Sequence, residues 1–240
     1  MPTGSKLRGS LYGRLVDTIG RQITTGELPA GATIFIDGLV EQHGISRPMV
    51  RECLRMLESK GMLEARPRLG TRVLGIGSWN LLDPDVIAWR MAGANLHDHL
   101  AEMMDLREAV EPVAARMATT NIKPAQLSLL RECAETMQAT RVRGDYHAYL
   151  VADVRFHDTL LSASGNKIFA QLSHAVESAL RGRQQTNLFP DEVPRVQVDA
   201  HLTIVECMER GDPAAVEQAA RDQLRVTREE IEERSRRWRS

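Results

Sequence analysis

Apolar residues recur every three or four positions along almost the whole chain, and this spacing limits the chain to a mainly helical fold. Leu11, Leu15, Ile19 and Ile23 repeat every four residues, so they share one face of a helix that Gly26 ends. Aromatic residues make up only 4% of the 240 residues, and the alternation typical of strands is rare. We therefore predict helices throughout, apart from a short stretch of strands in the first third of the chain.

The first 75 residues predict three helices followed by a hairpin. Ser46 can cap the third helix, Pro48 is tolerated in its first turn, and Gly61 suits the position after its end. The second helix, the third helix and two strands are predicted over residues 37–43, 47–60, 62–66 and 71–74. Three helices and a hairpin are the outline of a winged helix-turn-helix domain.

Residues 75–84 hold two glycines and a proline, and residues 76–84 are interpreted as a linker between two domains. Residues 5–75 would form the winged helix-turn-helix domain, and residues 85–235 predict a bundle of six or seven helices. Residues 1–75 carry 11 Lys/Arg against 7 Asp/Glu, whereas the remainder carries 20 against 25. A basic domain joined to an acidic one indicates that only the first binds a polyanion.

The composition excludes several classes of protein. With 42% apolar and 26% charged residues the chain suits an ordinary globular protein rather than a disordered one. It has no apolar run of the roughly 18 residues that a membrane span needs, and its start has no apolar signal segment. Its three cysteines, Cys53, Cys133 and Cys207, are too far apart for a metal knuckle. We predict a cytoplasmic protein with no membrane partner.

The helix over residues 47–60 has one apolar and one basic face. Val50 and Leu54 should pack inward, while Arg47, Arg51 and Arg55 form a ladder on another stripe. Arginine pairs bidentately with guanine in the major groove and also reaches phosphates, so the ladder suits DNA recognition. Ordinary amphipathic surface helices also carry such ladders, and the helix by itself leaves both interpretations open.

The turn between the two predicted strands favours DNA. Arg66, Arg68 and Arg72 surround Gly70, and a basic glycine-bearing tip can lie along a phosphate backbone or minor groove. The order Ser46-Arg47-x-x-Val50-Arg51-Glu52-x-Leu54, followed by Gly61 and Gly70-Thr71-x-Val73, closely resembles the DNA-binding domain of GntR-family bacterial transcription regulators. The resemblance implies that double-stranded operator DNA is contacted by Ser46, Arg47, Arg51, Arg68 and Gly70.

The second part carries motifs of its own in a fixed order. They are Leu106-Arg107-x-x-Val110-Glu111-Pro112, Asp153-x-x-Phe156-His157, Gly165-Asn166 and His201-x-x-Ile204. This order resembles the all-helical FCD-type effector domain of the FadR subfamily. Residues 79–89 are similar to the linker and first helix of a family member that represses a sugar-acid operon. The resemblance implies a mainly α protein with an FCD-like bundle that binds an effector.

Arg107 interrupts an apolar helical stripe that includes Leu100, Met103 and Val110. A guanidinium directed into a bundle needs an anion, because an unpaired buried charge costs several kcal/mol. The anion is either a carboxylate of a neighbouring helix or the carboxylate of a ligand held in the arginine fork.

Three further residues suit a metal ion. Asp153 and His157 lie one turn apart on an inward face, and His201 lies on the apolar face of a later helix. One carboxylate and two imidazoles are ligands for a divalent transition metal, with zinc as the expected ion. Where the family often has another histidine, this chain has Gln223. Two alternatives to a metal site remain. The histidines are ordinary buried core residues, or the pocket binds its ligand through hydrogen bonds without a metal.

The pattern as a whole predicts a repressor that a small carboxylate releases from its operator. The effector site would contain Arg107, Asp153, His157, Gln197, His201 and Gln223, and the effector would be a sugar acid such as an aldonate of the galactonate type. Lactate or another small organic acid is the alternative effector, and a constitutive DNA-binding protein with a non-sensing helical domain is the alternative function. We predict no enzyme, because no catalytic base, nucleophile or oxyanion motif lies near these residues. We predict a homodimer, because one winged domain makes too few contacts for tight operator binding.

Overall fold

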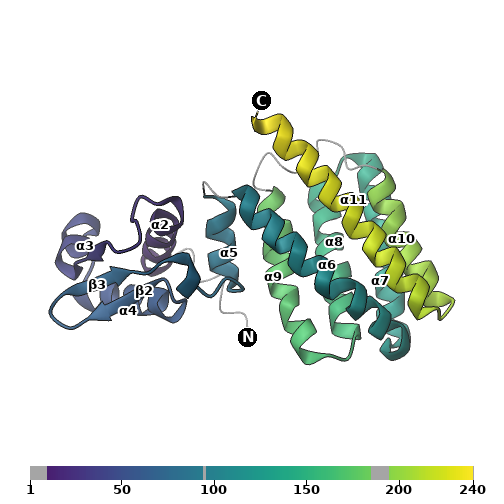
Figure 1. Cartoon of the computed structure of the whole chain (residues 1–240), viewed down its shortest axis with the longest axis horizontal. Helices are drawn as coiled ribbons and strands as arrows, with labels where there is room; N and C mark the ends of the chain where they lie inside the picture. Colours follow the sequence, from purple (N-terminus) through teal and green to yellow (C-terminus); the bar gives the residue numbers. More distant parts are fainter. Residues whose placement is uncertain (1–9, 94–95, 185–194, 240) are drawn as a thin grey trace. The chain divides into compact units, whose positions relative to one another are not determined.

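The chain folds as helices with one small sheet, which confirms the predicted fold class (Figure 1). The computed structural model describes residues 10–93, 96–184 and 195–239. It divides into two compact units, Met1–Leu96 and His97–Ser240. Within the described ranges, no helix combines the length and the apolar character needed to cross a membrane.

The N-terminal unit has the elements of a winged helix-turn-helix. In chain order they are α2 (Leu11–Thr25), β1 (Thr33–Ile34), α3 (Ile36–His43), α4 (Arg47–Ser59), β2 (Leu63–Arg66), β3 (Gly70–Val73), the 3-10 turn η1 (Ile76–Ser78) and α5 (Pro84–Met91). The antiparallel sheet has the order β1-β3-β2. Strand β1 was not predicted, because two residues are too few to show a period of two. Residues 5–9, which the sequence assigned to this domain, lie outside the described residues.

Helix α4 forms where the sequence places its start and stop signals. The Ser46 hydroxyl oxygen accepts a hydrogen bond from the Met49 amide at 3.5 Å and so caps the first turn. Gly61 follows the end of the helix with φ 72°, a conformation that glycine adopts without steric cost. Val50 and Leu54 are buried in the core of the unit, as the spacing predicts.

Helix α5 packs as part of the N-terminal unit, which differs from the predicted division at residue 84. Val86 and Trp89 belong to the same apolar core as the winged domain. The Lys60 ammonium is buried beside the Asp83 carboxylate, with both oxygens 2.8 Å from Nζ. The segment 76–84 is therefore held against the winged domain, and its glycine and proline do not make it a loose linker.

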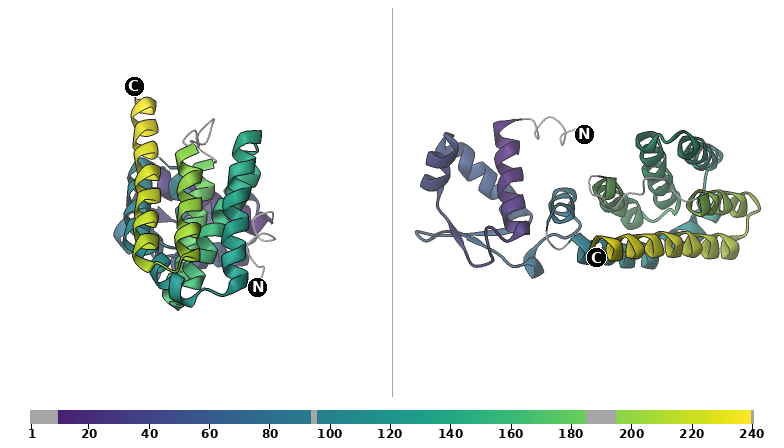
Figure 2. Two further views of the ribbon diagram at one scale, coloured as in Figure 1. Left: turned by 90° about the vertical axis from the view of Figure 1, so that its right-hand side faces the viewer. Right: turned by 90° about the horizontal axis from the view of Figure 1, so that it is seen from above.

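The C-terminal unit is a helical bundle. Its helices are α6 (Leu96–Asn121), α7 (Pro124–Arg143), α8 (Tyr146–Ala163), α9 (Lys167–Gln184), α10 (Arg195–Glu209) and α11 (Pro213–Arg239). Helix α8 packs between α7 and α9, and α10 packs against both α7 and α11, so that α7, α10 and α11 run side by side in Figure 2. Helices α5 to α11 make seven helices among the described residues, and no strand is described after β3, as predicted.

Candidate functional site

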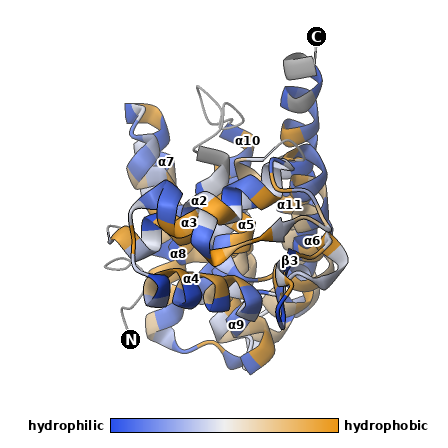
Figure 3. Cartoon of the chain, turned by 90° about the vertical axis from the view of Figure 1, so that its left-hand side faces the viewer, coloured by the Kyte–Doolittle hydropathy of each residue, from blue (hydrophilic) through white to orange (hydrophobic). Residues whose placement is uncertain are grey.

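The basic residues of α4 lie on its solvent-facing side. Arg47 and Arg51 are exposed, whereas Val50 between them is buried in the core. Hydrophilic residues recur along α4 in Figure 3. Arg47 Nη1 lies 2.5 Å from Asp37 Oδ1 of α3, and both side chains are largely exposed. Ser46 is exposed at the start of the helix, where its hydroxyl caps the first turn.

The hairpin of β2 and β3 ends in a tight basic tip. Arg68 is exposed and has a left-handed backbone with φ 64°. Gly70 has φ 88°, and a Cβ there would lie 2.7 Å from Thr33 Cγ2 and 3.0 Å from the Ile34 carbonyl oxygen. Only glycine fits this position, because it satisfies both the backbone and the close approach of β1. The tip therefore has one defined shape.

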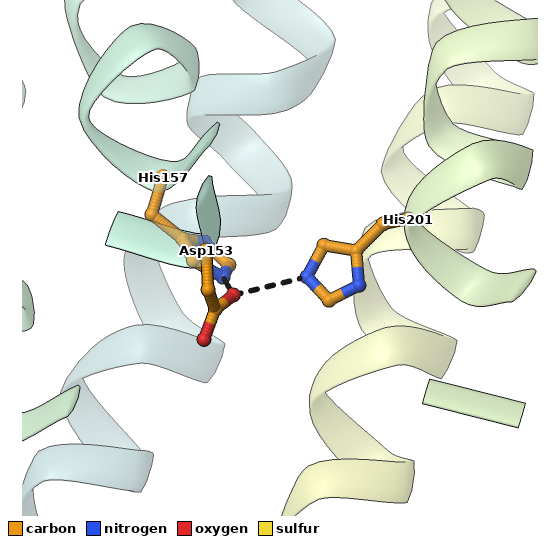
Figure 4. Close-up of side chains that lie close together, drawn as sticks. All are labelled: Asp153, His157 and His201. Atoms are coloured by element: carbon orange, nitrogen blue, oxygen red, sulfur yellow. Dashed lines mark ion pairs between the residues drawn. The ribbon is translucent and has the colours of Figure 1, made fainter. Parts of the chain in front are cut away.

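Five charged or titratable side chains gather inside the C-terminal bundle. Arg107 and Glu111 come from α6, Asp153 and His157 from α8, and His201 from α10. Each residue is at most 8% exposed. We call this group the buried polar cluster, and Figure 4 shows Asp153 between the two histidines. Residues 94 positions apart in the chain, Arg107 and His201, thus line the same interior region of the bundle.

Within the cluster, Arg107 has a carboxylate partner on its own helix. Its Nε donates to Glu111 Oε1 at 2.6 Å, its Nη2 donates to Glu111 Oε2 at 3.4 Å, and Nη2 lies 3.1 Å from His157 Nε2. The predicted anion is therefore present within the chain, one turn along α6 rather than on a neighbouring helix. The sequence interpretation used Glu111 only as part of a family motif and gave it no role in the site, although its i, i+4 spacing from Arg107 was a usable signal.

The histidines are oriented so that both Nε2 atoms face Asp153. His157 Nε2 lies 3.3 Å and His201 Nε2 lies 3.4 Å from Asp153 Oδ1. On the other side of the rings, His157 Nδ1 lies 2.8 Å from Glu111 Oε2, and His201 Nδ1 lies 2.7 Å from the Gln197 carbonyl oxygen. Carboxylates and carbonyls behind an imidazole commonly fix metal-binding histidines in this way.

One further observation supports a metal ion in the buried polar cluster. His201 Nε2 is buried and makes no hydrogen bond within the described structure. A buried polar atom without a hydrogen bond is costly, and a metal ion is one group that would satisfy it. One ligand atom each from Asp153, His157 and His201 lie within 4.8 Å of one another. The residue types suit zinc or another divalent transition metal.

Burial and charge act in opposite directions on the cluster. Burial would raise the pKa of the Glu111 carboxyl, but Arg107 and His157 outweigh it and hold that pKa at about 2. Burial would also raise the pKa of Asp153, but the imidazoles of His157 and His201 beside its carboxylate outweigh burial and keep that pKa far below its usual range. For His157, burial lowers the pKa, but the Glu111 carboxylate outweighs burial and raises it to about 9. The metal-free cluster is thus a network of charged groups that compensate one another.

The free energy of unfolding of the metal-free protein should fall as the pH rises from about 6.5 to about 9. Because the pKa of His157 is higher in the folded chain than its ordinary 6.5, its contribution is complete below 6.5 and lost as the pH rises through about 9. On the acid side, the contribution of Glu111 is lost as the pH falls from 4.5 to about 2. Urea unfolding with a chelator present measures both slopes. His157→Gln should flatten the decrease in the free energy of unfolding between pH 6.5 and about 9. An unchanged decrease in this variant would mean that another group causes it.

Gln197 and Gln223 are buried but already have partners in the protein. The Gln197 amide donates to Glu230 on α11, and the Gln223 amide donates to Thr227 at 3.2 Å. The direct link of Gln197 to the cluster is its main-chain carbonyl, which contacts His201. Glu230 was not singled out in the sequence, because its contact with Gln197 depends on how α10 packs against α11. Thr227 was not singled out either, although it lies one turn from Gln223 on α11, a spacing that the sequence shows.

Comparison with known proteins decides the family. Residues 11–73 match the model of the gntR family of bacterial regulatory proteins, and residues 102–226, more than half of the chain, match the FCD domain. The chain belongs to the GntR family. This GntR protein is therefore a transcription regulator with an FCD domain and not an enzyme, as predicted. GntR regulators bind DNA operators and small-molecule effectors, and FCD domains can bind metal.

Individual relatives cover nearly the whole chain. The regulator YieP of Escherichia coli K12 is 30% identical over 88% of this chain and 91% of its own length. The galactonate operon transcriptional repressor of the same strain is 30% identical over 86% of this chain and 90% of its own. A solved structure of the Listeria monocytogenes regulator Lar has a TM-score of 0.65 at 16% identity, covering 93% of this chain and 97% of that one. This last similarity concerns the fold.

Proposed function

We propose that this GntR regulator represses its target genes by binding an operator as a homodimer, and that a sugar acid releases it. The observation that carries the proposal is the buried polar cluster in the FCD domain. The fold does not need buried charged groups for its stability. Replacing a buried ion pair by apolar residues is often neutral or stabilising, so such a group is weak evidence for a stability role. Binding of a polar effector is the better explanation.

The metal ion of this proposal is zinc, held by Asp153, His157 and His201. When bound, it would supply a positive charge that attracts the carboxylate of the effector. His201 Nε2, which has no hydrogen bond in the described structure, supports this assignment. Gln223 stands where the family often has another histidine, so we assign only three protein ligands.

The effector is proposed to be a polyhydroxy carboxylate such as an aldonate. The 30% identity with the galactonate operon repressor supports this class. A relative at 26% identity from Paenarthrobacter nicotinovorans, named as a probable D-xylose utilization operon repressor, also concerns sugar metabolism by its name. Arg107 is already paired with Glu111, so we assign it to hydrogen bonding of the effector beside the metal rather than to charge neutralisation. Gln197 and Gln223 would exchange their present partners for effector hydroxyls.

Calorimetry should show that galactonate-type aldonates bind the metal-loaded protein more tightly than lactate or an acyl thioester. Chelation or His201→Ala should remove aldonate binding and the release of operator DNA, because each removes the metal site. His147→Ala is the matched control, since His147 is an exposed histidine on α8. Binding of lactate alone would contradict the sugar-acid proposal, and aldonate binding unaffected by chelation would contradict the metal.

The operator is proposed to be contacted by Ser46, Arg47, Arg51, Arg68 and Gly70. Homodimerisation would place two such faces on a two-fold operator. Of the two arginines on α4, Arg51 is the better one to substitute in a DNA-binding test. Arg47 has an ion-pair partner in Asp37, whereas Arg51 has no acidic partner among the described residues. The exposed tip residue Arg68 suits a phosphate contact.

Arg51→Ala should weaken operator binding by about 1–3 kcal/mol and relax base preference. Arg68→Ala should weaken binding to all DNA sequences and reduce the slope of its salt dependence by about 1. Operators selected from random duplexes with the wild type, followed by anisotropy titrations at several salt concentrations, measure both effects. Arg14→Ala removes an exposed charge on α2 and should leave binding unchanged. Equal binding by all variants would exclude α4 and the hairpin from the DNA face.

A further inference from the structure

The tip of the β2–β3 hairpin presents a large apolar side chain to solvent. Leu69 is 65% exposed. Its position is fixed, because Arg66 pairs with Gly70 across the hairpin and the Leu69 amide donates to the Arg66 carbonyl at 3.0 Å. The left-handed backbone of Arg68 and Gly70 completes the turn. Leu69 therefore projects from a defined turn, a setting in which solvent exposure of a leucine gives no stability.

A second exposed apolar residue lies at the base of the same tip. Phe35, at the start of α3, is 61% exposed. Its ring lies against Gly70, because a Cβ at Gly70 would be 3.2 Å from Phe35 Cε1. Phe35 stands in the Thr33-Ile34-Phe35-Ile36 segment that leads into α3. The phenyl ring and the close approach of β1 thus support the turn that carries Leu69.

The surroundings of Leu69 are cationic. Arg68 and Arg72 are exposed and have no acidic partner among the residues that the structure describes, and Arg66 pairs with Glu64 at the surface. Burying Leu69 in an apolar groove of a protein would also desolvate these guanidinium groups. A polyanion satisfies the arginines while it accepts the leucine, so charge complementarity favours DNA as the occupant.

We propose that Leu69 enters the minor groove of the operator and wedges between adjacent base pairs. Leucine is among the apolar residues with which minor-groove-binding proteins unstack a base step and bend the duplex. Arg68 and Arg72 would hold the phosphates on either side of it. Because pyrimidine–purine steps unstack most easily, the wedge would select operators that have such a step under the hairpin tip. The inference rests on the proposed DNA face and assigns it a specificity residue that carries no charge.

Fluorescence titration with the selected operator, labelled at both ends for energy transfer, tests the wedge in the full-length protein. Leu69→Ala should lower operator affinity by roughly tenfold and reduce the bend, while the salt slope stays the same because no charge is removed. Leu69→Met should restore both quantities, since methionine also serves as a wedge. A 2-aminopurine placed at the contacted step should brighten with wild type and Leu69→Met only. The melting temperature should not change, because Leu69 is exposed.

The outcomes separate this inference from the function on which it rests. Equal affinity and equal bending by wild type and Leu69→Ala would overturn the wedge, whereas operator binding by both would leave the DNA-binding proposal intact. Failure of the wild type to select any DNA would overturn both. A loss of the dimeric mass in Leu69→Ala would show that the tip docks on protein, and that result also overturns the wedge.

Discussion

Glu111→Ala should lower the free energy of unfolding by about 3–5 kcal/mol, because removing one partner leaves an uncompensated buried charge. In this protein the loss affects two groups, since the Glu111 carboxylate contacts both the Arg107 guanidinium and the His157 ring. Urea unfolding of the metal-free protein at pH 6 measures the change. The double variant Arg107→Met with Glu111→Leu should regain most of the stability, because it removes the charges together.

Glu108→Ala is the matched control for this experiment. Glu108 lies on the same helix and pairs with Arg228, but its side chain is 37% exposed. Surface ion pairs contribute about 0–1 kcal/mol, so this variant should remain close to the wild type. If Glu111→Ala were also within about 1 kcal/mol of the wild type, the charges of the cluster would not depend on one another as the distances indicate.

Trp89→Ala should destabilise the N-terminal unit by about 3–5 kcal/mol, the usual cost of emptying the site of a buried aromatic residue. Trp89 is 3% exposed, and its indole Nε1 donates to Asp17 Oδ1 at 2.8 Å. Its ring packs on the backbone of α2, where a Cβ at Gly20 would lie 2.5 Å from Trp89 Cδ2. Hydrogen exchange followed by segment should show lost protection in α2 and α4, while α7 and α8 keep theirs.

The control for Trp89 is Leu82→Ala, which shortens a 46% exposed residue in the segment before α5 and should leave exchange unchanged. The outcome also tests the division of the chain. If Trp89→Ala reduced protection in α7 and α8 and not in α2 and α4, α5 would belong to the helical domain, as the predicted boundary at residue 84 implies. Loss in α2 and α4 would place α5 with the winged domain.

The winged domain could be predicted from the sequence because interactions between residues close together in the chain define its helices and turns. The cap at Ser46, the apolar spacing of α4 and the glycine after its end are interactions within a few residues, so the sequence contains both partners. Glycine at position 70 likewise predicted a tight tip. Strand β1 escaped prediction because its pairing with β3 joins Ile34 to Thr71, and a two-residue segment carries no period.

The sequence also indicated which side chains would face the interior of the bundle. Asp153 and His157 are one turn apart, and His201 lies on an apolar face, so a common interior location followed from helical periodicity. Periodicity cannot say which atoms meet, because the contact depends on how α8 and α10 pack. Only the structure places both Nε2 atoms beside Asp153 Oδ1.

The sequence by itself determined the helical fold, the winged domain and the polar residues of the bundle, because each depends on neighbours along one helix or turn. The tertiary structure decided the partners across elements. It paired His157 with Glu111, left His201 Nε2 without a hydrogen bond in the described structure, and packed Trp89 against α2. The His157–Glu111 and Trp89–Gly20 contacts join residues 46 and 69 positions apart, and no local period encodes the packing that brings them together.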